Sequence, residues 1–171
     1  AIISALKRGR MYGKSVNHVK GSADFIGLNY YTHVLTSPFL PQTTEIDLPS
    51  RNHEIVTEFG YPMYAEGLHR ASKWLGKLKL PIEITENGVA DGEDKLRPEH
   101  LKRHLWMISK LIKEGVDIRS YYHWSLMDNF EWAEGYSMRF GLYHVDYDSQ
   151  TRTIRDSGKA YQSIIKSQKS G

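Results

Sequence analysis

The order of the apolar segments in this chain limits its possible fold more than any other feature of the sequence. Three short apolar runs, at residues 25–31, 81–85 and 118–125, are each typical of a buried strand. Two longer segments between them, 62–78 and 98–114, repeat apolar residues at helical spacing. Strands that alternate with helices in this way predict parallel strands joined by crossover helices. We therefore expect an α/β fold.

Three parallel strands do not make a complete domain. A parallel sheet normally has both faces covered, and here two edges would stay unpaired. A closed barrel of eight parallel strands takes about 250 residues or more, whereas this chain has 171. The chain therefore resembles the last part of such a barrel. After the third strand, residues 142–146 and 151–155 predict a small hairpin, and 157–166 predict a closing helix.

Strand periodicity predicts which residues share a face of the sheet, because alternate side chains point the same way. On each predicted strand, one such set ends in a polar or aromatic residue that can face the barrel mouth, where barrel enzymes keep their chemistry. Residues 33–60, before the first helix, are long enough to be a functional loop. The three sets are Phe25, Gly27, Asn29 and Tyr31; Ile82, Ile84 and Glu86; and Ser120, Tyr122 and Trp124.

Composition narrows the classes of function. The chain has no cysteine, which excludes disulfides and thiolate metal sites and accords with a reducing compartment, so we expect a cytoplasmic protein. The net charge of +3 comes from basic residues scattered among 20 acids, whereas nucleic-acid binding needs a dense basic face. No run of about 18 apolar residues is present, as a membrane span would need. We expect neither a nucleic-acid nor a membrane partner.

Two segments combine acids with aromatic residues. Glu86 ends an apolar run and precedes an Asn-Gly turn signal, and residues 124–132 contain two tryptophans and two more acids. Aromatic rings can cover the apolar face of a sugar, while carboxylates accept hydrogen bonds from its hydroxyls. These segments predict carbohydrate chemistry.

A pair of histidines could indicate a metal site. His100 and His104 are four residues apart on a predicted helix, a spacing that can bind zinc. In the metalloprotease pattern a glutamate directly follows the first histidine, whereas here Leu101 follows it. We interpret the pair as part of a water-exposed helix face, and we expect no metal and no other cofactor.

Four segments, in order, resemble the signatures of glycoside hydrolase family 1, the β-glucosidase family. They are residues 24–32, 84–88, 124–132 and 139–141. In that family these segments belong to the sixth, seventh and eighth strands of a (β/α)8 TIM barrel and to the loop beyond. The resemblance implies that residues 1–171 are the C-terminal part of one barrel domain, about strands 6–8.

The same resemblance implies roles for seven residues. Glu86 resembles the nucleophile that forms a covalent glycosyl-enzyme intermediate, and Tyr31 resembles the hydroxyl that hydrogen-bonds it and tunes its ionisation. Asn29 resembles a residue lining the same pocket. The remaining four resemble the aromatic walls and the hydroxyl-binding acid of the glycone subsite: Trp124, Glu131, Trp132 and Phe140.

Glu131 also bears on the substrate class. Relatives that act on 6-phosphorylated sugars typically have a serine there and supply a lysine and a tyrosine soon after. This chain has Glu131, Met138 and Phe140 at those positions. A carboxylate would repel a phosphate, so the resemblance implies an unphosphorylated β-glycoside as substrate.

One element of the family is missing. A retaining glycosidase needs a second carboxyl group about 5–5.5 Å from the nucleophile as acid/base, which the family carries in a Thr-x-Asn-Glu-Pro segment that this chain lacks. Strand periodicity puts Glu83 on the face opposite Glu86. We therefore expect the chain alone to be inactive and its partner to be the N-terminal portion of the barrel.

A carbohydrate-binding pseudoenzyme or receptor-like module is the alternative function, and retention of Glu86 favours the hydrolase.

Overall fold

The computed structural model describes residues 23–34 and 53–168 and consists of parallel strands alternating with helices. The elements are β1 (Ile26–Asn29), α2 (Ala65–Leu75), β2 (Ile82–Asn87), α3 (Arg97–Lys113), β3 (Ile118–His123), β4 (Tyr143–Val145), β5 (Arg152–Ile154) and α4 (Asp156–Gln168). The first three strands form a parallel sheet in the order β1-β2-β3, and β4 pairs with β5 in an antiparallel hairpin. The predicted α/β alternation, hairpin and closing helix are confirmed. The predicted loop at 33–60 lies partly outside the described residues.

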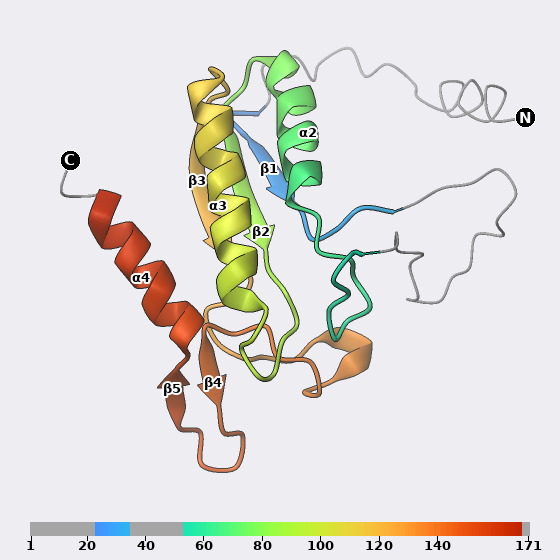
Figure 1. Cartoon of the computed structure of the whole chain (residues 1–171), viewed down its shortest axis with the longest axis vertical. Coiled ribbons are helices and arrows are strands. Elements are labelled where there is room, and N and C mark those ends of the chain that lie inside the picture. The colour runs from blue at the N-terminus through green and yellow to red at the C-terminus, as the bar shows by residue number, and fades with distance from the viewer. Residues whose placement is uncertain (1–22, 35–52, 169–171) are drawn as a thin grey trace, which may run out of the picture.

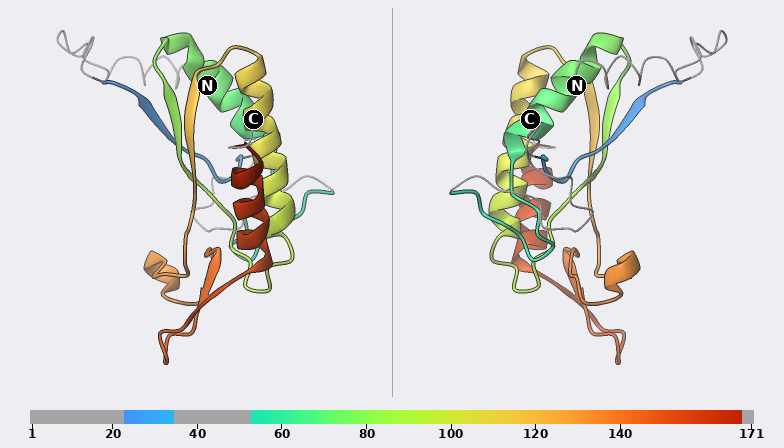
Figure 2. Two further views of the ribbon diagram at one scale, coloured as in Figure 1. Left: turned by 90° about the vertical axis from the view of Figure 1, so that its left-hand side faces the viewer. Right: turned by 90° about the vertical axis from the view of Figure 1, so that its right-hand side faces the viewer.

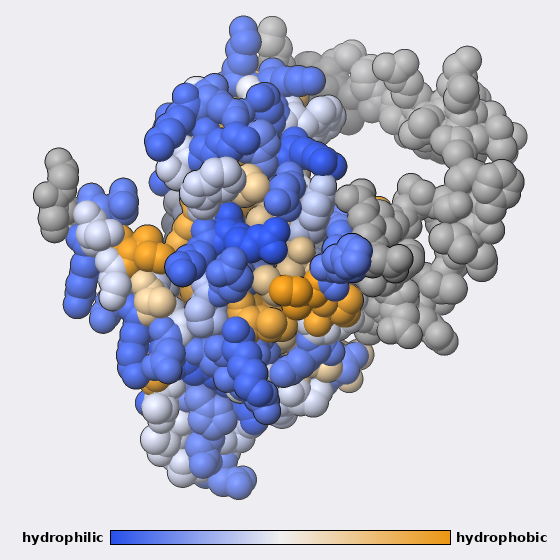
Figure 3. Space-filling view, in the orientation of Figure 1, coloured by the Kyte–Doolittle hydropathy of each residue, from blue (hydrophilic) through white to orange (hydrophobic). Residues whose placement is uncertain are grey.

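The helices lie on one side of the parallel sheet, as Figure 1 and the side views in Figure 2 show. The core forms between these layers: Ile82 and Ile84 of β2 and Leu68 of α2 are fully buried, and Ile108 of α3 is buried beside them. Burial of each such side chain contributes about 1.5–3 kcal/mol. The outward surface over α2 and α3 is mostly hydrophilic (Figure 3). Among the described residues, no helix is both long and apolar enough to cross a membrane.

Two helix predictions were wrong in detail. The first helix begins at Ala65 instead of Pro62, and the Pro62 carbonyl instead accepts a hydrogen bond of 2.6 Å from the Thr32 hydroxyl, which holds this segment beside the end of β1. Helical spacing predicts that Leu101, Leu105, Ile108 and Ile112 form the buried stripe of the second helix. On α3 the buried stripe instead includes Leu111, whereas Ile112 is 52% exposed. The stripe is rotated because α3 also buries its two histidines against the sheet side.

The face predicted for Glu86 was wrong, and a strand irregularity explains why. Ile84 and Asn87 are both buried on the helix-covered side, and the register of β2 shifts between them. Two residues, Thr85 and Glu86, therefore occupy the span in which a regular strand would place one. Glu86 thus leaves the face of Ile84 and joins the side of the sheet that carries Glu83. Glu83 lies three residues earlier, about 10 Å along the strand, and does not line the cavity near Glu86.

The side of the sheet away from the helices is open in the part of the chain that the structure describes. Phe25 is 47% exposed and Tyr122 of β3 is 55% exposed. Within the described ranges, β1 and β3 each pair on one side only. A parallel sheet with one bare face and two free edges is typical of a portion of a larger parallel fold.

Candidate active site

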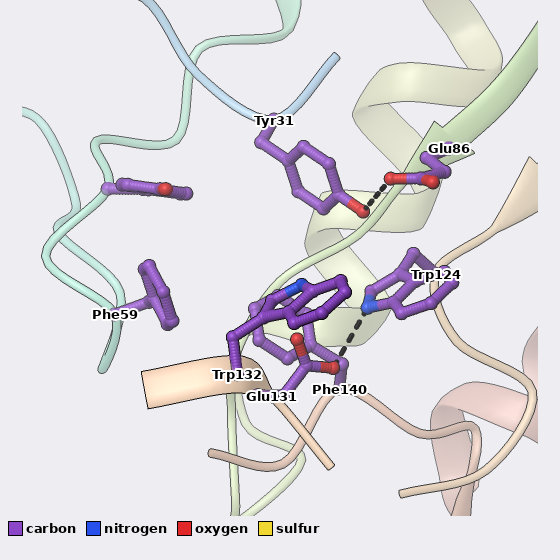
Figure 4. A pocket seen from close by; sticks show the side chains of 8 residues that line it. Tyr31, Phe59, Glu86, Trp124, Glu131, Trp132 and Phe140 are labelled. Carbon is purple, nitrogen blue, oxygen red and sulfur yellow. Dashed lines mark hydrogen bonds between the residues drawn. The ribbon is translucent and has the colours of Figure 1, made fainter. Parts of the chain in front are cut away.

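The site begins where β1 and β2 end. Tyr31 follows β1, and its hydroxyl donates a hydrogen bond of 2.7 Å to Oε2 of Glu86 in β2 (Figure 4). Burial and this hydrogen bond raise the pKa of the Tyr31 phenol far above its usual value. Tyr31 therefore stays protonated and holds one oxygen of the Glu86 carboxylate, and Glu86 lines the cavity.

A second acid faces the cavity from beyond β3. The indole Nε1 of Trp124 donates a hydrogen bond of 2.9 Å to Oε1 of Glu131 (Figure 4). Burial raises the pKa of Glu131, as does the charge of Glu86, while the hydrogen bond from Trp124 lowers it. The Trp124–Ser125 peptide bond is cis. The hydrogen bond between Trp124 and Glu131 joins an aromatic ring and a carboxylate in one wall of the cavity.

These residues enclose a cavity of about 250 Å³, just below the range of about 300–1,000 Å³ that is common for ligand pockets. Six of the seven predicted site residues line it. Two further aromatic residues complete the lining, so the cavity combines six aromatic side chains with two carboxylates. The lining residues are Tyr31, Phe59, Tyr61, Glu86, Trp124, Glu131, Trp132 and Phe140.

Phe59 and Tyr61 were not predicted from the sequence. Their rings lie 4.8 Å apart, and Phe59 is 5.8 Å from Phe140. Both belong to the segment that precedes α2, and Gly60 between them has φ +77°, a conformation that favours glycine. Two aromatic residues on either side of a glycine in a long loop were the sequence pattern from which this part of the cavity wall could have been predicted.

Asn29 does not line the cavity. Its Oδ1 accepts a hydrogen bond of 2.6 Å from the Thr85 hydroxyl, on the open side of the sheet. Trp132, in contrast, does line the cavity, although the residue is 84% exposed. The roles predicted for both residues remain predictions.

A buried ion-pair network supports the segment that carries Trp124, Glu131 and Phe140. Asp128 accepts two hydrogen bonds from Arg155, at 2.9 and 3.0 Å, and one of 2.9 Å from the amide of Gly141. Burial opposes ionisation of Asp128, but these hydrogen bonds keep its pKa below its usual value. Asp128 therefore organises the turn without facing the cavity.

The histidines of α3 do not form the water-exposed face that we expected from the sequence. His100 and His104 are each only 1% exposed, and their rings stack with centroids 3.9 Å apart. The ring of His123 in β3 lies 6.4 Å from that of His100. Within the described ranges, no group of three or more histidine, cysteine, aspartate or glutamate residues could hold a metal ion. The histidines belong to the packing between α3 and β3.

We expect His104 to make stability depend on pH. Burial lowers its pKa to about 4, against about 6.5 in an unfolded chain. Between these values the unfolded state binds more protons, so stability falls as pH drops from 6.5 toward 4. His104→Phe should reduce the loss in free energy of unfolding between pH 7 and pH 5 by about 1–2 kcal/mol. Urea unfolding at both pH values measures this, with the exposed His53 changed to Phe as control. An equal pH dependence in both variants would contradict it.

The fold and the cavity together define a class: a portion of a parallel α/β fold with two carboxylates among aromatic side chains at or beyond the carboxyl ends of its strands, an arrangement suited to sugars. The family model for glycosyl hydrolase family 1 matches residues 8–170. The chain belongs to glycosyl hydrolase family 1.

Individual relatives agree with this assignment. The chain is 39% identical to β-glucosidase A of Thermotoga maritima over 171 residues, covering 91% of this chain and 37% of that protein. It is 37% identical to a β-galactosidase of Sulfolobus acidocaldarius, covering 87% of this chain and 32% of that protein. The crystal structure of a β-glucosidase from Pyrococcus furiosus superposes with a TM-score of 0.81 at 35% identity, over 96% of this chain and 37% of that one. The chain thus spans about a third of the length of these relatives and aligns with part of their barrel.

Proposed function

We propose that this chain is the C-terminal portion, about strands 6–8, of a retaining β-glycosidase that hydrolyses unphosphorylated β-D-glycosides. The observation that carries the proposal is the Glu86 carboxylate, held by Tyr31 at 2.7 Å in a cavity that also contains the Trp124–Glu131 pair. The activity belongs to the complete barrel, because the chain covers about a third of its relatives. The absence of cysteine supports a cytoplasmic location.

In the proposed reaction Glu86 attacks the anomeric carbon of the sugar, and the bond from that carbon to the leaving oxygen breaks. An acid from the N-terminal portion donates a proton to that oxygen. The deprotonated acid then takes a proton from water, whose oxygen attacks the same carbon and releases Glu86. Two displacements give net retention of configuration.

The chain's own residues bind and orient the sugar in this scheme. Trp124 offers a flat apolar surface for the sugar ring, and Glu131, fixed by the Trp124 indole, accepts hydrogen bonds from its hydroxyls. Tyr31 keeps the attacking carboxylate in place, since its raised pKa leaves it a donor throughout the working pH range. Each of these contacts keeps the reacting atoms in position, which is a large part of enzymatic rate enhancement.

The test is made on a complete barrel, in which the N-terminal portion of the Thermotoga maritima relative is fused upstream of residue 8; we call it the joined protein. In it, Glu131→Ala should reduce kcat/KM for an aryl β-glucoside by about 30- to 1,000-fold, because about 2–4 kcal/mol of charge-assisted hydrogen bonding is lost. Much of the loss should fall on kcat, since remote binding energy helps to distort the ring.

The same residue tests the substrate class. The parent should reject the 6-phosphate of the glucoside, and Glu131→Ser should lose part of that discrimination because a negative charge is removed. Glu134→Ala is the matched control, since Glu134 lies three residues away and does not line the cavity. A parent that prefers the phosphorylated substrate would contradict the assigned substrate class, and binding without turnover would favour the carbohydrate-binding alternative.

A further inference from the structure

The side chain of Asn87, the last residue of β2, lies between the ends of the two neighbouring strands. It is fully buried. Its Nδ2 donates a hydrogen bond of 2.7 Å to the carbonyl of Tyr30, which follows β1, and its Oδ1 accepts one of 2.9 Å from the hydroxyl of Tyr121 in β3. Its backbone carbonyl accepts a third, of 2.9 Å, from the amide of Trp124. One residue therefore ties all three strands together at the level of the cavity.

Asn87 and two of its three partners, Tyr30 and Trp124, are cavity residues or their direct neighbours in the chain. Asn87 follows Glu86, Tyr30 precedes Tyr31, and Trp124 is itself part of the wall. The amide of Tyr30 also donates a hydrogen bond of 2.9 Å to the carbonyl of Glu86. The distance between the Tyr31 hydroxyl and the Glu86 carboxylate thus depends on where Asn87 holds the backbone.

The position requires one side chain that supplies both a donor and an acceptor, and the asparagine amide does so. The Tyr30 carbonyl requires a donor, whereas the Tyr121 hydroxyl presents its proton and requires an acceptor. Burial raises the pKa of Tyr121 well above its usual value, so that hydroxyl remains a donor. An ionised aspartate would present acceptors on both sides, and an alanine would leave two buried polar groups without their partner.

Asn87 also lies where β2 departs from regular geometry. The register shift between Ile84 and Asn87 turns Glu86 toward the cavity. Because Asn87 returns to the buried side and is hydrogen-bonded there, it fixes the far end of this irregularity. Bulges of this kind serve to re-aim a side chain next to active sites.

We infer that Asn87, oriented by Tyr121, is a positioning residue that sets the geometry of Glu86 relative to Tyr31 and Trp124. The inference rests on the proposed function, in which Glu86 is the nucleophile. A displacement of about 1 Å at a reacting group can cost about 10²-fold in rate. A positioning residue that acts on the attacking group changes kcat more than KM, because it does not touch the sugar.

The test compares variants of the joined protein on an aryl β-glucoside. Asn87→Ala should lower kcat by about 10²-fold and change KM by less than about threefold. Tyr121→Phe should lower kcat by about three- to tenfold in the parent, but should have no further effect in the Asn87→Ala background, because Tyr121 acts through Asn87. Tyr161→Phe is the matched control: its hydroxyl donates to the Tyr121 carbonyl at 3.3 Å, away from the cavity, and kcat should not change.

A pH profile adds a readout that loss of packing alone would not produce. In Asn87→Asp, a protonated carboxyl supplies one donor and one acceptor, as the amide does. The kcat of Asn87→Asp relative to the parent should therefore rise as the pH falls from 7 to 5. The relative kcat of Asn87→Ala should stay flat over the same range.

The outcomes separate this inference from the proposed function. A parent that a 2-fluoro glucoside does not label at Glu86 would overturn the proposed function. A labelled parent with unchanged kcat in Asn87→Ala, or a loss confined to KM, would overturn only the role of Asn87. If Asn87→Ala fails to fold, Tyr121→Phe decides: a lowered kcat beside an unchanged Tyr161→Phe supports the inference, and an unchanged kcat overturns it.

Discussion

Glu86→Ala in the joined protein is expected to lower kcat for an aryl β-glucoside by about 10⁴–10⁶-fold, the range seen when an essential nucleophile is removed. The reason is that Glu86 forms the bond to the anomeric carbon, so without it neither displacement can proceed. Its position among the cavity residues, held by Tyr31, is what singles it out from the other acids of the chain.

Added azide distinguishes the loss of a nucleophile from misfolding. A small anion can enter the vacated space and attack the same carbon, so we expect partial recovery of turnover with a glycosyl azide of inverted configuration as product. Glu93→Ala is the control, because Glu93 is an exposed acid in the loop after β2 and is paired with Lys95. Full activity in Glu86→Ala, or no effect of azide with a folded protein, would argue against Glu86 as the nucleophile.

The purified 171-residue chain alone is expected to hydrolyse essentially no aryl β-glucoside. It offers a nucleophile but lacks the family's acid/base segment, and a positioned general acid is worth about 10²–10⁴-fold in rate. The open face of the sheet, with Phe25 and Tyr122 exposed, adds the loss of the remaining pocket walls. Addition of the N-terminal portion as a separate chain should restore activity.

Varying the leaving group of the substrate separates the two causes of this inactivity, which are the missing general acid and the open pocket. A dinitrophenyl glucoside needs little protonation of its leaving oxygen, so it should recover the part of the rate that is due to the missing acid. The part due to the open pocket should remain lost. Turnover by the chain alone at rates typical of enzymes, with an ordinary aryl glucoside, would show that the barrel is not needed.

Much of the fold could be predicted because its signals are local. The apolar runs and helical repeats identify the strands and helices to within a few residues, as the bounds of β2 and α3 illustrate. The start of α2 was missed because the Pro62 carbonyl bonds to Thr32, a residue 30 positions away. Such long-range contacts override the local preference of proline for the first turn of a helix.

The site was predicted less evenly. Glu86 and Trp124 stand at the ends of apolar runs, Glu131 lies in the aromatic and acidic segment 124–132, and all three line the cavity. The face of Glu86 could not be derived from a period of two, because the register shift in β2 adds a residue. The sequence marks Asn87 only as part of an Asn-Gly turn signal, because the partners of a buried amide become visible only when the three strands are placed side by side.

The most direct test of the account is mass spectrometry of the joined protein after incubation with a 2-deoxy-2-fluoro-glucoside that carries a good leaving group. The fluorine slows both displacements, and the leaving group restores the first, so the covalent intermediate accumulates. We predict one fluoroglucosyl group per molecule, attached to Glu86 in the peptide that spans the end of β2. An unlabelled protein that still hydrolyses the parent glucoside, or a label on another residue such as Glu131, would contradict the account.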